Sequence, residues 1–121
     1  MTKRSFEKKY SFDLRQKEGQ RLLERYPDRC PVIVENAEGS TLPELDKHKF
    51  LLPYETTVAQ FMTILRQRMI ISPETALFMF INNFLPRAGE TIGNLYVKHK
   101  SEDNFLYLKI SGENTFGKCN I

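Results

Sequence analysis

The spacing of apolar positions along this chain changes several times, and each change marks an expected element. A short helical turn is expected around residues 4–9. From 12 to 26 the residues are charged and helix-favouring, with a sparse apolar stripe of Phe12, Leu22, Leu23 and Tyr26 that includes Gly19. This spacing predicts an amphipathic helix that ends at Pro27. Because a helical glycine costs about 1 kcal/mol relative to alanine, we expect a close packing contact at Gly19.

Two apolar runs after this helix predict strands. The first is 31–35, which begins with a proline at a tolerated position, and the second is 48–52. Side chains of the second strand alternate between faces, with Lys49 and Leu51 on one and His48, Phe50 and Leu52 on the other. Because only the turn segment 36–44 separates the two strands, we expect an antiparallel hairpin.

The segment after Thr57 gives the clearest helix signal. Thr57 and Gln60 fit a capping box, in which each side chain satisfies the other residue's free backbone N–H group. Apolar residues follow the helical spacing at Val58, Phe61, Met62, Leu65 and Met69, with Ile64 and Arg68 beside the stripe. A short second turn is expected at 72–74.

The last third of the chain supplies two more strands. The dense apolar run 77–82 predicts a central strand buried on both faces, and 105–111 predicts the closing strand. A short helical turn is expected at 92–96. The order is strand, strand, helix, strand, strand, which is an α+β domain. Its most economical arrangement is a ubiquitin-like β-grasp with two additional N-terminal helices.

The composition is that of an ordinary intracellular domain. At 121 residues the chain supports one core, and no apolar run approaches the roughly 18 residues of a membrane span. The charged start lacks the apolar core of a signal peptide, so we expect a cytoplasmic protein, monomeric in solution. No metal or other cofactor is expected.

The two cysteines, Cys30 and Cys119, are too few for a disulfide framework, and Cys30 is expected to be a small buried hydrophobe. We expect no enzymatic activity. An enzyme that uses one of these thiols is an alternative, although the sequence places neither cysteine beside His48 or His99.

The net charge of +3 originates in the N-terminal segment. Residues 1–29 carry nine Lys or Arg against five Asp or Glu, whereas the remainder carries nine against ten. Such a segment is either a solvated helical face or a dock for an acidic partner such as anionic lipid or tubulin. Aromatic residues are not interleaved with the basic ones as in a stacking platform, so nucleic acid is not an expected partner.

Gly117 stands four residues from the end of the sequence. Because glycine has no Cβ, its backbone fits narrow channels that exclude other residues. Removal of 118–121 would leave an unhindered carboxylate on Gly117 that suits acyl transfer.

Together with this glycine, four blocks resemble the autophagy ubiquitin-like modifiers, which include the microtubule-associated protein light chains and the GABA-receptor-associated proteins. They are YPDRCPVIVE at 26–35, LDKHKFLLP at 45–53, the capped helix at 57–68, and the stretch from FLY to FG at 105–117.

The resemblance implies a modifier made of three parts: an N-terminal helical extension at 1–26, a ubiquitin-like domain at 27–117 and a propeptide at 118–121. A processing cysteine protease would cut after Gly117. Activating and conjugating enzymes would then carry the glycine as a thioester to the amine of phosphatidylethanolamine. Two acyl chains hold a protein on a membrane where a single chain binds only marginally. The lipidated protein would reside on the autophagosomal membrane.

The resemblance also implies binding of short aromatic-x-x-aliphatic motifs in cargo receptors and autophagy proteins. Such a peptide would add as a strand to the sheet edge at 47–52. A first pocket, for the aromatic side chain, would consist of Glu18, Leu22, Pro31, Ile33, Lys49, Leu51 and Phe105. A second pocket, for the aliphatic side chain, would consist of Phe50, Leu52, Pro53, Thr56, Phe61 and Ile64. Acidic residues beside the motif would be attracted by Lys47, Lys49 and Arg68.

Several positions depart from the family pattern. Thr56 replaces an aliphatic residue, so a more polar second pocket is expected, and the bulky Tyr54 is expected to crowd the end of the groove. The segment 87–90 replaces a proline-threonine loop, and Tyr10 takes a common histidine position. These changes leave partner preference open. The alternative function is a non-lipidated ubiquitin-like adaptor that links vesicles or receptors to microtubules.

Overall fold

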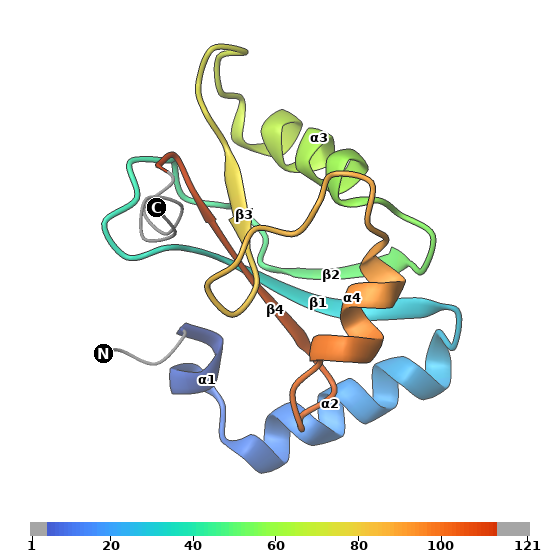
Figure 1. Cartoon of the computed structure of the whole chain (residues 1–121). Helices are drawn as coiled ribbons and strands as arrows, with labels where there is room; N and C mark the ends of the chain where they lie inside the picture. Colours follow the sequence, from blue (N-terminus) through green and yellow to red (C-terminus); the bar gives the residue numbers. More distant parts are fainter. Residues whose placement is uncertain (1–4, 114–121) are drawn as a thin grey trace.

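The sheet of this protein has four strands in the order β2-β1-β4-β3 (Figure 1). The computed structural model describes residues 5–113. Strand β1 pairs with β2 antiparallel and with β4 parallel, and β4 pairs with β3 antiparallel. In chain order the elements are α1 (Ser5–Lys9), α2 (Phe12–Arg25), β1 (Arg29–Asn36), β2 (Lys49–Pro53), α3 (Val58–Met69), β3 (Phe78–Phe80), α4 (Ile92–His99) and β4 (Leu106–Ser111). The α+β class and the expected hairpin are confirmed.

Both faces of this sheet are covered by helices. In Figure 1, α3 and α4 lie against one face, and α1 and α2 lie against the other. Successive side chains of a strand point to opposite faces. In β1, Val32 packs into the larger core beneath α3 and α4, and Ile33 packs into a smaller core beneath α2. In β4, Leu108 packs into the larger core and Tyr107 packs into the smaller one.

Helix α3 begins at the expected capping box. The N–H of Gln60 donates to Thr57 Oγ1 at 3.1 Å, and the N–H of Thr57 donates to Gln60 Oε1 at 2.9 Å. The buried side chains of the helix are Val58, Phe61, Leu65 and Met69. They are the apolar positions that the spacing predicts, except that Met62 is only partly buried.

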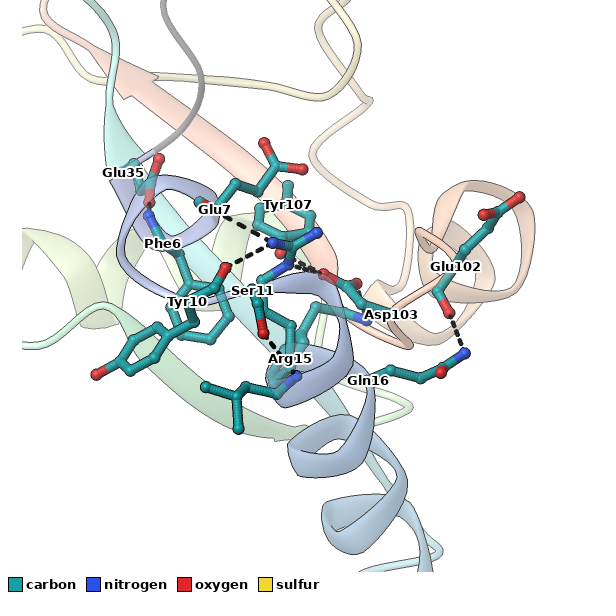
Figure 2. Close-up of polar contacts among 12 residues, drawn as sticks. Phe6, Glu7, Tyr10, Ser11, Arg15, Gln16, Glu35, Glu102, Asp103 and Tyr107 are labelled. Atoms are coloured by element: carbon teal, nitrogen blue, oxygen red, sulfur yellow. Dashed lines mark hydrogen bonds and ion pairs between the residues drawn. The ribbon is translucent and has the colours of Figure 1, made fainter.

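A buried carboxylate fastens α2 to the sheet (Figure 2). Asp103 is 1% exposed. Its Oδ2 accepts from Arg15 Nε at 2.9 Å and from the Tyr107 hydroxyl at 2.5 Å. Its Oδ1 accepts from the N–H of Phe105 at 3.0 Å. Burial and the bond to Asp103 raise the pKa of Tyr107 well above its ordinary value, so Tyr107 stays a hydrogen-bond donor.

The short helix α1 is held by a second buried carboxylate. Glu35 is 7% exposed and accepts from the N–H of Ser5 at 3.1 Å. It also accepts from the N–H of Phe6 at 2.8 Å (Figure 2). The Phe6 ring packs edge-on against Phe105, with 5.2 Å between the ring centroids. A five-residue helix is unstable in isolation, so these contacts fix its position.

The run 77–82 is not a central strand. Strand β3 has three residues and lies at the edge of the sheet, where it pairs with β4. Leu77, Met79 and Ile81 are buried because they pack into the larger core. The strand then ends because Asn82 and Asn83, with φ of 49° and 71°, turn the chain back. The other correction concerns 92–96, which is part of the eight-residue helix α4.

The apolar stripe of α2 is buried only around its centre. Gly19 and Leu22 are buried, whereas Phe12 is 40% exposed. A Cβ on Gly19 would lie 2.4 Å from the carbonyl oxygen of Asp103 and 2.9 Å from the Cβ of Asn104. The close contact expected at Gly19 is therefore confirmed.

We predict that Gly19→Ala destabilises the protein, although alanine normally favours a helix. The gain in helix propensity is about 1 kcal/mol at most, whereas overpacking costs typically 1–3 kcal/mol and the clash here is with backbone. Urea titration should show a net loss of about 1 kcal/mol or more in the free energy of unfolding. Gly89→Ala is the matched control because nothing lies within 4 Å of its Cβ. Equal losses at the two positions would contradict this explanation.

Candidate functional site

Strand β2 is an edge of the described sheet. It pairs with β1 on one side, in a register that sets Leu51 opposite Pro31 and Lys49 opposite Ile33. Its other side has no strand partner within residues 5–113. Backbone groups along such an edge can pair with an added strand, and edge lysines such as Lys49 deter unwanted pairing.

The residues predicted for the first pocket meet on the α2 face of the sheet. Leu22, Ile33 and Phe105 form one apolar cluster, and the half-buried Leu51 packs against it. Pro31 is next to this cluster as the ladder partner of Leu51. Sequence reasoning missed two further members, Tyr107 and Phe6. The alternation of β4 could have identified Tyr107, because it lies two residues after Phe105 and points to the same face.

An ion pair joins α2 to β2 beside this cluster. Lys49 Nζ donates to Glu18 Oε2 at 2.8 Å. Arg21 donates from Nε to Glu18 Oε1 and from Nη2 to Oε2, both at 3.0 Å. The hydrogen bonds from Arg21 and then from Lys49 lower the pKa of Glu18 to about 2. Glu18 is therefore ionised at physiological pH and holds the lysine beside this apolar cluster.

The residues predicted for the second pocket lie on the opposite face. Phe50 and Leu52 are each 6% exposed, and Phe61 is fully buried. The rings of Phe50 and Phe61 meet edge-on, 5.2 Å apart. Ile64, which follows Phe61 in α3, is 38% exposed. The half-buried Thr56 donates its N–H to the carbonyl of Pro53 at 3.1 Å. These residues combine a buried aromatic floor with an exposed aliphatic side chain.

Two cations lie over this aromatic floor. Lys47 Nζ is 5.1 Å from the centroid of the Phe50 ring, and Arg68 Cζ is 5.8 Å from it. Both distances are within the range of a cation–π contact. Of the rim residues expected from the sequence, Lys47 and Arg68 therefore lie over Phe50, whereas Lys49 is bound to Glu18 beside the first cluster.

Two of the departures from the family pattern lie toward α4. The Tyr54 carbonyl accepts the N–H of Gly93 at 2.9 Å, and the Tyr54 ring contacts that of Tyr96 at 6.3 Å. The segment 87–90 supports the start of α3, because the carbonyl of Glu90 accepts the N–H of Val58 at 2.9 Å. That segment also lines a separate cleft of about 290 Å³ with Phe84, Leu85, Pro86, Leu95, Lys98 and His99. The cleft shares no residue with the two predicted pockets.

Gly117 and Cys119 lie outside the described residues. Within 5–113, no helix combines the length and apolar character needed to span a membrane. The same part of the chain holds no group of three or more His, Cys, Asp or Glu side chains arranged for a metal ion.

Residues 14–117 match the family model described as "Autophagy protein Atg8 ubiquitin like". The chain belongs to the Atg8 family. Autophagy-related protein 8d of Arabidopsis thaliana is 48% identical over 113 residues, which is 93% of this chain and 94% of the relative. Autophagy-related protein 8 of Saccharomyces cerevisiae is 44% identical over 116 residues, or 96% and 99% of the two chains.

Solved structures of Atg8 proteins are also similar. The Trypanosoma brucei ATG8 crystal structure aligns with a TM-score of 0.86 at 37% identity, covering 91% of this chain and 95% of the other. Plasmodium falciparum Atg8 in complex with a P. falciparum Atg3 peptide aligns with a TM-score of 0.83 at 33% identity, covering 92% and 98%. The expected family and ubiquitin-like fold are confirmed. This Atg8 protein is a ubiquitin-like modifier of autophagy.

The cysteine described in this Atg8 protein is not built as a nucleophile. Cys30 is fully buried in the larger core. Burial is the main cause that raises the pKa of its thiol to about 12, and the charge of Glu55 acts in the same direction. A reactive cysteine needs a lowered pKa and solvent access, so this environment favours a packing role.

We predict that Cys30 resists alkylation in the folded protein. Only the thiolate reacts, and a pKa of about 12 in place of 9.0 leaves about a thousandfold less thiolate at neutral pH. Iodoacetamide at pH 7.5, followed by peptide mass spectrometry, should leave Cys30 unmodified under native conditions. The same treatment in urea is the control and should modify it fully. Rapid native modification of Cys30 would revive the thiol-enzyme alternative.

Proposed function

We propose that this Atg8 protein acts as a lipid-conjugated modifier through Gly117. A cysteine protease would remove 118–121, and activating and conjugating enzymes would transfer the glycine carboxyl to the amine of phosphatidylethanolamine. Support comes from the family match, which extends to residue 117, and from the relative that was solved with an Atg3 peptide. The two acyl chains of the lipid would anchor the protein to the autophagosomal membrane.

We further propose that β2 receives the aromatic-x-x-aliphatic motifs of cargo receptors and autophagy proteins. The observation that carries this proposal is the arrangement of two apolar clusters, one packed with Leu51 and one containing Phe50, on opposite faces of one edge strand. In an extended peptide, residues three positions apart point to opposite faces. A strand added to β2 would therefore direct its aromatic side chain toward Leu51 and its aliphatic side chain toward Phe50 and Ile64. The spacing of the motif and the geometry of the edge agree.

Apolar anchors should dominate the affinity of this groove. A buried anchor residue contributes 2 kcal/mol or more, whereas an exposed charge contributes roughly 0–1 kcal/mol. The half-buried Leu51 belongs to the first class, and the exposed Lys47 belongs to the second. Thr56 gives the second pocket a hydroxyl, which should favour motifs that tolerate a polar neighbour.

We predict that Leu51→Ala weakens binding of a motif peptide by about thirtyfold or more, and Lys47→Ala by about fivefold at most. Isothermal titration with a peptide that contains Trp-x-x-Leu measures both. Leu85→Ala is the matched control, because Leu85 is 41% exposed and lines the separate cleft. The reverse order of the first two variants, or a comparable loss with the control, would refute the two-pocket arrangement.

We predict that Gly117→Ala prevents conjugation in cells. Alanine adds a Cβ at the position that must enter the narrow active sites of the processing and conjugating enzymes. Intact-mass analysis should find the wild type ending at residue 117 with the added mass of phosphatidylethanolamine, and should find the variant without lipid. Gly89→Ala controls for the substitution itself. A wild-type protein without lipid under starvation would favour the alternative of a non-lipidated adaptor.

A further inference from the structure

The Arg68 guanidinium at the second pocket is already bound to a carboxylate of the same chain. Arg68 Nε donates to Asp46 Oδ1 at 3.3 Å, and Arg68 Nη2 donates to Asp46 Oδ2 at 3.2 Å. This is a two-point contact in which one edge of the guanidinium faces both carboxylate oxygens. Arg68 also lies over the Phe50 ring, so Asp46 engages the cation at the mouth of the second pocket.

The position of Asp46 is set by its neighbours in the chain. Leu45 is 5% exposed and packs into the larger core, which anchors the segment just before β2. Asp46 itself points outward, with 68% of its side chain exposed, and Arg68 is 34% exposed. Water and a competing carboxylate can therefore reach the pair, in contrast with the buried pair of Arg15 and Asp103.

We propose that Asp46 is a specificity-determining residue that competes with the acidic residues of a bound peptide for Arg68. This inference rests on the proposed binding of peptides along β2. A guanidinium offers two-point contact along an edge, and Asp46 occupies the Nε edge. A peptide carboxylate must displace Asp46 or use the remaining Nη1–Nη2 edge, where the negative charge of Asp46 weakens the attraction of Arg68 for a second carboxylate. Asp46 thus lowers the preference of the groove for acidic flanks.

The competition should be modest in size and sensitive to salt. An exposed ion pair changes affinity by up to about fivefold, and salt screens it. Lys47, the other cation over Phe50, has no ion pair among those of the described residues, so it remains available for an acidic flank. Replacement of Asp46 by the isosteric, neutral asparagine should release Arg68 without altering the shape of the segment.

The test compares two peptides with the same aromatic-x-x-aliphatic core, one flanked by glutamates and the other by glutamines at the same positions. We expect Asp46→Asn to tighten the glutamate peptide about three- to fivefold and to change the glutamine peptide less than about 1.5-fold. Glu44→Gln is the matched control, since it removes an exposed negative charge two residues earlier. An equal gain from this control would overturn the proposal in favour of a general field effect.

A double-mutant cycle with Arg68→Gln supplies the second arm. If Asp46 acts through Arg68, the gain from Asp46→Asn disappears in the Arg68→Gln background. The proposal would be overturned if Asp46→Asn still tightened binding of the glutamate peptide in the Arg68→Gln background. It would also be overturned if the Asp46→Asn variant bound both peptides more weakly than the wild type. Thermal unfolding of each variant verifies that it is folded. The glutamine peptide distinguishes the role of Asp46 from the proposed docking of peptides along β2. If the wild type does not bind the glutamine peptide, peptide docking itself is refuted.

Discussion

Because successive side chains of β1 and β4 point to opposite faces and nearly all of them are buried, this sheet has to be covered on both sides. Helices α3 and α4 cover one face, and α1 and α2 cover the other (Figure 1). Since all four helices are used on the faces, the outer side of β2 is left without a strand partner in the described part of the chain. The candidate binding edge is a consequence of this two-sided burial.

The packing of α2 on the sheet depends on the buried carboxylate of Asp103, and the protein would be destabilised if that carboxylate lost a partner. Asp103 is buried as a charge, and loss of one partner of such a pair typically costs 3–5 kcal/mol. Arg15 and Tyr107 satisfy the same oxygen of this carboxylate from α2 and β4. Gly19 allows the helix to approach closely enough for that contact. The same approach places Glu18 beside Lys49, so the docking of α2 also brings together residues of the predicted first pocket.

Periodicity was sufficient to predict most elements and the alternation of β2, because both depend on local spacing. Periodicity was insufficient for β3. The apolar run 77–82 shows that this segment is buried, but it does not show whether the segment lies in the middle of the sheet or at its edge. That depends on contacts between residues far apart in the chain. The buried, paired role of Asp103 could not be predicted from the sequence for a related reason. A lone aspartate before a strand resembles a turn residue until the fold brings Arg15 to it, 88 residues away.

The predicted pockets came from the family resemblance and not from spacing, since Phe50 and Phe61 are equally consistent with plain core packing. In the structure both rings are buried in the larger core, as core packing requires, and their part in a peptide pocket stays a prediction. The polar rim was harder to anticipate. Lysines at alternate edge positions are visible in the sequence, but the acids that bind the cations, Glu18 and Asp46, lie on other segments.

Each apolar patch beside β2 thus has a cation at its rim and an acid that holds the cation. Lys49 is bound by Glu18 at the first patch, and Arg68 by Asp46 at the second. Such exposed pairs contribute little to folding stability. An unpaired strand edge between two apolar patches is, however, a site where other chains can add indiscriminately. An added strand with acidic residues would compete with Glu18 and Asp46 for these cations, whereas a neutral strand could leave both ion pairs in place. The apolar floors would then set how tightly a peptide binds, and the ion pairs would adjust how much acidic flanks add.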